Sequence, residues 1–464
     1  ICEQPHRSML KGPGTWKLWL GSVLLLVLKE VQSHCSFYSS ALELMSKHRL
    51  IDGHNDLALR LRMFHSNKLS RLDLYNNTRT STDITRLKAA HIGGQMFAAY
   101  VMCTTQDKDA VRLTLEQIDV IRRMCTEYPE LELVTTAEDL RKTKKMACLI
   151  SVEGGHSIDS SIPVLRMFYQ LGVRSVTLTH NCNTPWAETS SGYYPNFYSK
   201  RQNNSLTDFG KAVVDEMNRL GMLIDLSHTS WATAHAVLQR SRAPVIFSHS
   251  SSYTVCNHSR NVPDDLLQML VTLCRCTKRY GHDPCVYIRN SKENGGLIMV
   301  NFHSAFIACK QEASISLVAD HFDYLRRVVG AESIGIGGDY DGATGFPPGL
   351  EDVSKYPALI CELLRRNWTV EELARVLRLN FLRVFDSVEK IRDEMSSVTP
   401  SEVDIPFAEA DHYCRSVLKP PKISRDMNLL QERGGALSPT LSPPSWALLL
   451  LTLLHPYSST VISG

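Results

Sequence analysis

Residues 49–56 read RLIDGHND: an apolar run, Arg49–Asp52, leads directly into imidazole and carboxylate side chains. Seven more short apolar runs follow, separated by amphipathic helical stretches, and strands that alternate with helices form a parallel sheet buried on both faces. Eight such units predict a closed (β/α)8 TIM barrel, and an open doubly wound sheet is the alternative. The other strands are expected at Met96–Met102, Ala147–Val152, Arg174–Thr179, Met222–Ser227, Pro244–Ser248, Leu297–Phe302 and Ser333–Gly337. Helices are expected at Ala110–Tyr128, Ile162–Gly172, Leu206–Leu220 and Ile315–Val329.

Ionisable residues stand at the carboxyl ends of six of these eight runs. In the first run, His54 and Asp56 are two residues apart, so on a strand both side chains point to one side. On a (β/α)8 barrel, the carboxyl ends of the strands form the face that carries active sites. The remaining strand-end residues are Glu153, His180, His228, His249 and Asp339.

Each of these residues alone has an ordinary structural explanation. A single strand-end His is usually a hydrogen-bonded structural residue, and an Asp or Glu before glycines usually caps a turn. Together, however, they would bury several imidazoles and carboxylates without partners, which is costly. A divalent cation removes that cost, and a set of nitrogen and oxygen ligands without Cys favours zinc, with manganese or iron as alternatives.

The chain resembles the membrane (renal-type) dipeptidase family from about Ser39 to about Glu394. The resemblance is carried by IDGHNDL, SVEGGHSIDSS, LTHNCNTPWAE, LIDLSH, APVIFSHSS, CNHSRNVPDD and GGDYDG, followed by GLEDVSKYP. It implies a zinc metallopeptidase that hydrolyses dipeptides with a free C-terminal carboxylate. The reaction in that family uses a hydroxide that bridges two zinc ions per chain. Cysteinyl-glycine conjugates such as leukotriene D4 are further expected substrates.

The same resemblance assigns the metal ligands. His54 and Asp56 would hold one zinc, His228 and His249 the other, and Glu153 would bridge the two ions.

It also assigns the residues that handle substrate and protons. His180 would polarise the substrate carbonyl, and Asp339 would contact the substrate and transfer protons. Arg260 would bind the substrate's free carboxylate, which restricts the enzyme to short peptides. The alternative is that Arg260 only pairs with Asp264 or Asp265 on the following helix.

The chain contains thirteen cysteines. The resemblance implies the disulfides Cys103–Cys182 and Cys256–Cys309, and a homodimer in which Cys414 joins the two subunits. Three more cysteines lie in helical or strand patterns and are expected as buried thiols: Cys125, Cys148 and Cys361.

The segment Val271–Arg289 departs from the family pattern because it makes the chain longer there. We expect a spliced-in insertion on the face of the barrel opposite the catalytic one, since it precedes the seventh strand. The alternative is a second metal site that uses His282 with three cysteines of the insertion: Cys274, Cys276 and Cys285.

The N-terminal residues 1–33 have the order of a secretory signal. Basic residues precede the apolar run Leu18–Leu28, and small residues follow it. Met9 is the expected start, with residues 1–8 upstream of it, and 36–415 is the expected catalytic barrel. Secretion agrees with four glycosylation sequons, at Asn76, Asn203, Asn257 and Asn367.

The C-terminal residues 416–464 have the order of a glycolipid-anchor signal. A Pro-rich stretch leads to the small residues Gly434, Gly435 and Ala436, and a polar spacer then precedes the apolar run Trp446–Leu454. We therefore expect a GPI-anchored protein on the extracellular face of the plasma membrane. A disordered tail is the alternative.

The composition narrows the function classes. The net charge is +3 and no basic run stands out, so nucleic acid is not an expected partner. Two rival functions are a dipeptidase-like surface protein for adhesion or reception, and a barrel amidohydrolase that acts on a non-peptide amide or lactam.

Overall fold

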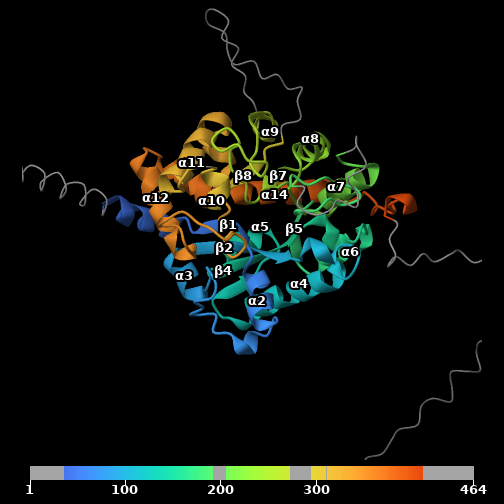
Figure 1. The fold of residues 1–464 in the computed structure, drawn as a ribbon, viewed down its shortest axis with the longest axis horizontal. Helices are drawn as coiled ribbons and strands as arrows, with labels where there is room; N and C mark the ends of the chain where they lie inside the picture. The colour runs from blue at the N-terminus through green and yellow to red at the C-terminus, as the bar shows by residue number, and fades with distance from the viewer. Residues whose placement is uncertain (1–35, 192–204, 272–293, 310, 411–464) are drawn as a thin grey trace, which may run out of the picture. The chain divides into compact units, whose positions relative to one another are not determined.

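The computed structural model of the protein describes residues 36–191, 205–271, 294–309 and 311–410. In Figure 1 the strands lie at the centre and the helices surround them. Eight of the strands fall within or overlap the eight apolar runs of the sequence. They are β1 (Leu50–Asn55), β2 (Ile92–Tyr100), β4 (Met146–Glu153), β5 (Val173–Thr177), β6 (Leu223–Asp225), β7 (Val245–Phe247), β8 (Leu297–Val300) and β9 (Ile334–Ile336).

Every strand pairing in the sheet is parallel, and the order is β2-β1-β9-β8-β7-β6-β5-β4, with β3 (Leu131–Leu133) beyond β4. A further pairing between β2 and β4 closes the ring of eight. The predicted barrel is therefore confirmed, and the open sheet is wrong.

The short strand β3 was not predicted. It pairs with the start of β4, at Met146, while β5 pairs with β4 only from Ile150 onward. Only Leu131 of its three residues is buried. Such a strand leaves no apolar run in the sequence, because its pairing partner rather than its composition fixes it.

In most of the barrel strands, neighbouring residues belong to two separate apolar clusters. Cys148 and Ile150 of β4 face the surrounding helices, while Ala147 and Leu149 join a cluster inside the barrel. Phe385 of helix α14 (Asn380–Glu394) belongs to the inner cluster as well. Each fully buried side chain of this size contributes about 1.5–3 kcal/mol, so the strands are fixed from both faces.

The four predicted helices are found with ends shifted by at most two residues: α4 (Ala110–Glu127), α6 (Ile162–Gln170), α7 (Asp208–Leu220) and α11 (Ile315–Val329). The end of α7 has a local cause, because Gly221 adopts a φ of 76° that an L-residue rarely takes. The remaining α-helices are α2 (Leu57–His65), α3 (Ile84–Ala89), α5 (Ala137–Lys142), α8 (Trp231–Arg240), α9 (Asp264–Leu270), α10 (Ser304–Ile307), α12 (Tyr356–Arg365) and α13 (Val370–Ala374), and residues 36–47 are also helical.

The connection from α9 to β8 contains the segment Val271–Arg289. Most of it, with its three cysteines and His282, lies outside the described residues. On either side of it, the Gly296 N–H donates to Leu270 O at 2.9 Å. The two ends of the connection are therefore joined at the barrel itself.

A disulfide links Cys125 of α4 to Cys148 of β4. The prediction of two buried thiols was wrong, because the buried face of α4 brings its cysteine onto the strand. The two cysteines are 23 positions apart in the sequence, and a disulfide that closes a loop of this length stabilises a fold by about 3 kcal/mol. Cys361 is buried in α12, as expected.

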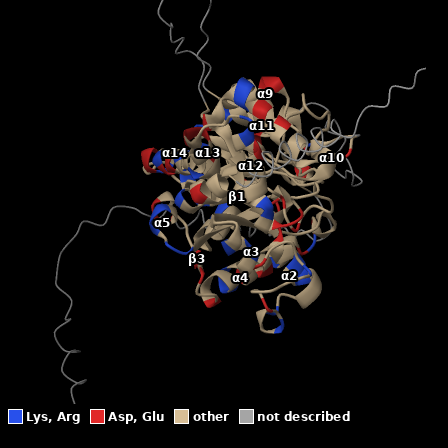
Figure 2. Cartoon of the chain, turned by 90° about the vertical axis from the view of Figure 1, so that its left-hand side faces the viewer, with Lys and Arg blue, Asp and Glu red and all other residues tan. Residues whose placement is uncertain are grey.

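Charged residues of both signs are intermixed over the outer helices (Figure 2). Arg366, for example, pairs with Asp320 at 2.6 Å and Asp323 at 2.7 Å. Such surface pairs contribute little each to stability.

Several predicted features fall outside the described residues: the signal segment 1–33, Asn203, Cys414 and the tail with its anchor signal. The other three sequon asparagines, Asn76, Asn257 and Asn367, are exposed. Among the described helices, none has both the length and the hydropathy needed to cross a bilayer.

Candidate metal centre

Glu153, the last residue of β4, lies at the middle of the carboxyl-terminal face of the barrel. Its Oε1 atom is 3.2 Å from Nε2 of His228, 3.6 Å from Nε2 of both His54 and His249, and 4.0 Å from Nε2 of His180. The strands thus bring four imidazoles around one carboxylate. We call these residues, with Asp56 and Asp339, the strand-end cluster.

On one side of Glu153, His54 and Asp56 share the end of β1. His54 Nε2 lies 3.0 Å from Asp56 Oδ2, and one ligand atom of Asp339 lies within 4.8 Å of one from each. The second oxygen of Asp56, Oδ1, is buried and has no hydrogen-bond partner among the described residues. A buried carboxylate oxygen without a donor is costly, and a cation would satisfy it.

On the other side, the Nε2 atoms of His228 and His249 face each other at 3.0 Å. His228 Nδ1 lies 3.1 Å from Asn181 Oδ1, an acceptor, so this nitrogen carries the proton. His249 Nδ1 lies 2.7 Å from Ser248 Oγ. If both rings are protonated at Nδ1, two bare lone pairs face each other, an arrangement that only a cation between them makes favourable.

The proton on His249 Nδ1 is fixed by a buried carboxylate. Ser248 Oγ donates to Asp225 Oδ2 at 2.6 Å, and Thr177 Oγ1 donates to the same oxygen at 2.6 Å. Because the Ser248 proton is committed to Asp225, the hydroxyl oxygen must accept from the imidazole. A chain of three residues, Asp225, Ser248 and His249, therefore aims Nε2 at Glu153.

The backbone at the site takes conformations that are rare elsewhere. His228 and Asp339 have φ values of 67° and 63°. A left-handed backbone at a residue other than Gly costs about 1–3 kcal/mol and persists where the surroundings enforce it. Gly154 has a φ of 101°, and a Cβ there would lie 2.5 Å from Cε1 of His156, so the turn after Glu153 requires glycine.

The charges of the strand-end cluster favour a cation. Burial alone would lower the pKa of His54, but the carboxylates of Glu153 and Asp56 outweigh it and raise that pKa to about 10. Burial raises the pKa of Glu153 well above its usual range. Burial also raises the pKa of Asp339 to about 6, although His54 and Asn301 oppose this.

The other three imidazoles are kept neutral. Burial, followed by neighbouring positive groups, lowers the pKa of His180, His228 and His249 well below the usual value. Neutral imidazole is the form that ligates metal ions.

Arg260 lies beside this cluster and is only 5% exposed. Its Nη2 donates to His249 O at 3.3 Å and its Nη1 to Ser250 Oγ at 3.4 Å, both long bonds. In the part of the chain that the structure describes, its Nε has no partner. It does not pair with Asp264, which binds Thr254 and Tyr324 instead. A buried guanidinium that lacks a full set of acceptors has capacity left for an anion.

Arg260 lies in residues 250–262 after β7, beside residues 301–309 after β8, which include α10. We call these two segments the Arg260 loops. The disulfide Cys256–Cys309 joins them, as the family resemblance implies. Asn261 Nδ2 also bridges them, with bonds of 2.9 Å to Cys256 O and 2.7 Å to Phe306 O. The position of Arg260 therefore depends on these cross-links rather than on a strand.

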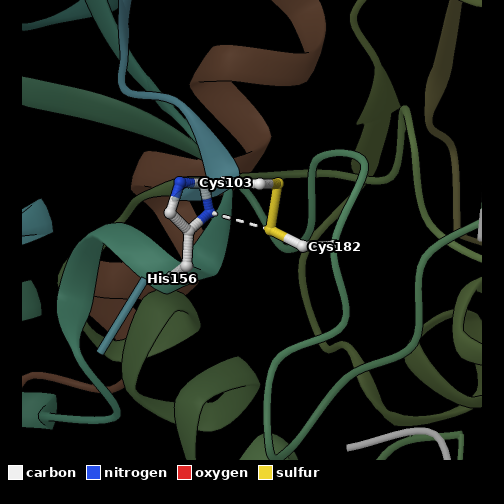
Figure 3. A group of neighbouring side chains, drawn as sticks. All are labelled: Cys103, His156 and Cys182. Atoms are coloured by element: carbon white, nitrogen blue, oxygen red, sulfur yellow. Dashed lines mark hydrogen bonds between the residues drawn. A yellow bond between two sulfur atoms is a disulfide. The ribbon is translucent and has the colours of Figure 1, made fainter. Parts of the chain in front are cut away.

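The second implied disulfide, Cys103–Cys182, is also present, and Figure 3 shows it beside the imidazole of His156. His156 Nδ1 faces Cys182 Sγ at 3.8 Å, and His156 Nε2 donates to Val101 O at 2.9 Å. Cys103 Sγ lies 4.0 Å from Nδ1 of His180. The disulfide thus packs directly behind His180.

The structure places all eight predicted site residues at one face of the barrel. It also adds residues that the sequence analysis missed, because they contact the site residues and not the position of a ligand. Ser248 could have been found from the sequence, because it directly precedes His249. Asn301 has no such signal, and its Nδ2 donates to Asp339 Oδ2 at 2.9 Å. The other missed residues are Asn181, Asp225 and His156.

Comparison with known sequences identifies related proteins. The sequence profile of the membrane dipeptidase family (peptidase family M19) matches residues 38–273 and 287–399, with an interruption inside the segment that departs from the pattern. Dipeptidase 3 of Rattus norvegicus is 50% identical over 389 residues, which are 84% of this chain and 75% of that protein. Dipeptidase 3 of Homo sapiens is 50% identical over 377 residues, or 81% and 72% of the two chains.

Solved structures agree on the fold. A probable dipeptidase, PvdM, from Pseudomonas aeruginosa superposes with a TM-score of 0.66 at 18% identity, over 77% of this chain and 99% of that one. A metallo peptidase from Rhodobacter sphaeroides, liganded with a phosphinate mimic of the dipeptide L-Ala-D-Ala, gives a TM-score of 0.60 at 22% identity, over 73% and 99%.

Proposed function

The chain belongs to the membrane dipeptidase family, and on that basis we propose that it is a zinc dipeptidase that cleaves dipeptides with a free C-terminal carboxylate. The observation that carries the proposal is the convergence of four imidazole Nε2 atoms on Glu153 Oε1, at 3.2–4.0 Å. The relatives named dipeptidase and the Rhodobacter sphaeroides structure with its dipeptide mimic support the substrate class.

We propose two zinc ions per chain. His54 and Asp56 would hold one ion, His228 and His249 the other, and Glu153 both. The unpartnered Asp56 Oδ1 and the facing His228 and His249 nitrogens support this set, because a cation would satisfy both. Zinc, when bound, supplies a Lewis acid and lowers the pKa of water toward neutrality.

Three further residues would act on the substrate. Asp339, held by Asn301 beside His54 and Asp56, would accept a proton from water and return it to the leaving amine. His180 stays neutral and would donate an N–H to the carbonyl oxygen as negative charge develops there. Arg260 would bind the free carboxylate through its planar fork.

The complete ligand set argues against a purely adhesive or receptor role, in which such residues have no need to be retained together. Arg260 argues for a substrate with a carboxylate, and a lactam that carries one would satisfy the same contact. Cysteinyl-glycine conjugates such as leukotriene D4 fit the proposal because they end in a free carboxylate.

The decisive experiment combines metal analysis with hydrolysis of Ala-Ala and its C-terminal amide by the purified protein. We expect close to two zinc ions per chain, reversible loss of activity on chelation, and a strong preference for the free acid. A folded sample that contains no metal and hydrolyses Ala-Ala at full rate would contradict the proposal.

Substitution of Arg260 tests the carboxylate contact. A charge-assisted bidentate contact is worth about 1.5–3 kcal/mol, so Arg260→Ala should lower kcat/KM for the acid by about tenfold to a few hundredfold. Lys should rescue only partly, because it offers a point charge instead of a fork. An unchanged acid-to-amide ratio in folded Arg260→Ala would remove Arg260 from the substrate site.

We further propose that the protein is a homodimer linked through Cys414 and anchored by a glycolipid at one of Gly434, Gly435 and Ala436. Phosphatidylinositol-specific phospholipase should then release it from the cell surface, and truncation after Arg433 should secrete it. Retention after phospholipase treatment would point to another form of attachment.

A further inference from the structure

A second group of polar side chains surrounds Phe306 beside Arg260. The rings of His258 and His303 each lie 4.6 Å from the Phe306 ring, centre to centre, and Arg260 Cζ lies 5.4 Å from the same ring. We call His258, His303 and Phe306 the Phe306 cluster. Both Arg260 loops contribute to it, and none of its residues has a role in the proposed chemistry.

Both imidazoles use Nδ1 to hold the backbone. His258 Nδ1 accepts from the Arg260 N–H at 3.1 Å, and His303 Nδ1 accepts from the Ala305 N–H at 3.1 Å. A neutral imidazole that accepts at Nδ1 carries its proton at Nε2. Within the described residues, neither Nε2–H has a hydrogen-bond partner. Two N–H donors therefore remain for a ligand.

The charge around these donors is positive. Burial lowers the pKa of His258 and His303, and Arg260 is the charged group that adds most to this lowering. The carboxylate of Asp264, at the start of α9, accepts hydrogen bonds from Thr254 and Tyr324. Both imidazoles are only half-buried, so a ligand can reach them.

We propose that the Phe306 cluster receives the side chain of the substrate's C-terminal residue and favours Asp or Glu at that position. This inference rests on the proposed function, in which Arg260 binds the α-carboxylate. Three C–C bonds in Asp, and four in Glu, each of about 1.5 Å, separate the side-chain carboxyl carbon of that residue from its α-carboxyl carbon. The separation of the two carboxylates is thus comparable to the 5.4 Å between Arg260 Cζ and the centre of the Phe306 ring.

The donors also explain why an apolar side chain fits less well. An apolar group placed against the two Nε2–H groups removes water from them and returns no acceptor, which leaves the donors unsatisfied. A neutral amide such as Asn supplies an acceptor without the charge. A carboxylate supplies both, and charge-assisted hydrogen bonds are about twice as strong as neutral ones.

The test compares kcat/KM for Ala-Asp with Ala-Asn, and for Ala-Glu with Ala-Gln, in the full-length zinc-loaded protein. We expect wild type to favour the acid over its amide by about tenfold, as one charge-assisted contact predicts. The double variant His258→Asn, His303→Asn keeps an acceptor near each Nδ1 position and removes both Nε2–H donors. Its acid-to-amide ratio should fall to about one. A general loss of activity cancels in this ratio.

The chain offers matched controls. His258→Asn preserves the sequon at Asn257, because the middle residue of a sequon is free unless it is Pro, so the glycan stays constant. His235→Asn makes the same change on the exposed surface of α8 and should leave the ratio at the wild-type value. His258→Asp adds a negative charge at the Phe306 cluster and should favour Ala-Asn over Ala-Asp.

A wild-type ratio of one or less, or a ratio that survives in the double variant, overturns the inference. The double variant could instead lose kcat/KM equally for Ala-Ala, only when the free α-carboxylate is present, with no change in the Ala-Asp to Ala-Asn ratio. That result also overturns the inference, since the imidazoles then serve only the α-carboxylate. Hydrolysis of Ala-Ala by wild type separates the two levels: if it occurs, the proposed function stands even where the side-chain preference fails.

Discussion

Glu153 and Arg260 lie close together, yet the chain holds them in different ways. Glu153 ends a strand that is paired on both sides, with Tyr100 of β2 and Thr177 of β5, inside a closed ring. Arg260 lies in a loop whose position depends on Cys256–Cys309 and on Asn261. The strand-end cluster is thus held by strand pairing, whereas the Arg260 loops are held by cross-links to each other. We therefore expect changes in the strand-end cluster to affect the catalytic step, and changes in the Arg260 loops to affect the choice of substrate.

The largest expected effect breaks the strand-end cluster. Glu153→Gln should lose both metal ions and lower kcat/KM by about 10³-fold or more, because one carboxylate serves the whole cluster. Asp339→Asn should keep the metals and still lose about 10²–10⁴-fold in turnover, since proton transfer fails while the ligands remain. Metal content and kcat measured on both variants decide the matter. Equal metal loss in the two would make Asp339 a ligand.

The next effect loosens the Arg260 loops. Changing Cys256 and Cys309 to Ser, or Cys125 and Cys148 to Ser, should cost about 2–5 kcal/mol of stability in either case. Only the first pair should also raise KM, by about tenfold, because only that disulfide positions Arg260. Thermal unfolding and Ala-Ala kinetics on both double variants test the difference. A similar KM in the two would mean that the loops hold Arg260 without their disulfide.

Acid should also act on the Arg260 loops, through His321. This buried imidazole accepts the Ser252 N–H at Nδ1, 3.1 Å away, and Nε2 donates to Ile307 O at 3.1 Å, so it joins both loops to α11. Burial lowers its pKa to about 4.

Between the unfolded pKa of about 6.5 and the folded value, only the unfolded chain takes up the proton, so this contribution is complete above pH 6.5 and lost as pH falls. His321→Gln removes the titration. The stability advantage of wild type over the variant should therefore shrink by about 2–3 kcal/mol between pH 7 and pH 4.5. Urea unfolding at both pH values measures it, and an advantage independent of pH would exclude His321 as the titrating group.

The smallest effect refines the strand-end cluster itself. Ser248→Ala removes the link from Asp225 to His249, and Asn181→Ala removes the partner of His228. Either change should weaken zinc binding by about 10–100-fold, with Ser248→Ala the larger because a carboxylate stands behind the hydroxyl. Competition with a chromogenic chelator gives the affinities. A stronger effect from Asn181→Ala would reverse the ranking of the two supports.

The comparison also separates what the sequence predicts from what it does not. The barrel and the strand-end residues follow from apolar runs that end in His, Asp or Glu, because strand pairing puts all those ends at one face. Contacts between elements leave no such pattern. From the sequence, Cys125 and Cys148 are predicted to be core residues of a helix and a strand. Their disulfide depends on how α4 packs on β4. His258 and His303 read as loop residues until Phe306 brings them together.

The hydrogen bond between Gly296 and Leu270 affects how the chain tolerates insertions and deletions. It fastens α9 to the start of β8, so the barrel is complete whether the intervening connection is short or long. The entropy of closing a loop rises only slowly with its length, by about 0.6 kcal/mol for each doubling. The connection between α9 and β8 can therefore become longer or shorter, or accept an engineered tag, without a shift in the register of the strands.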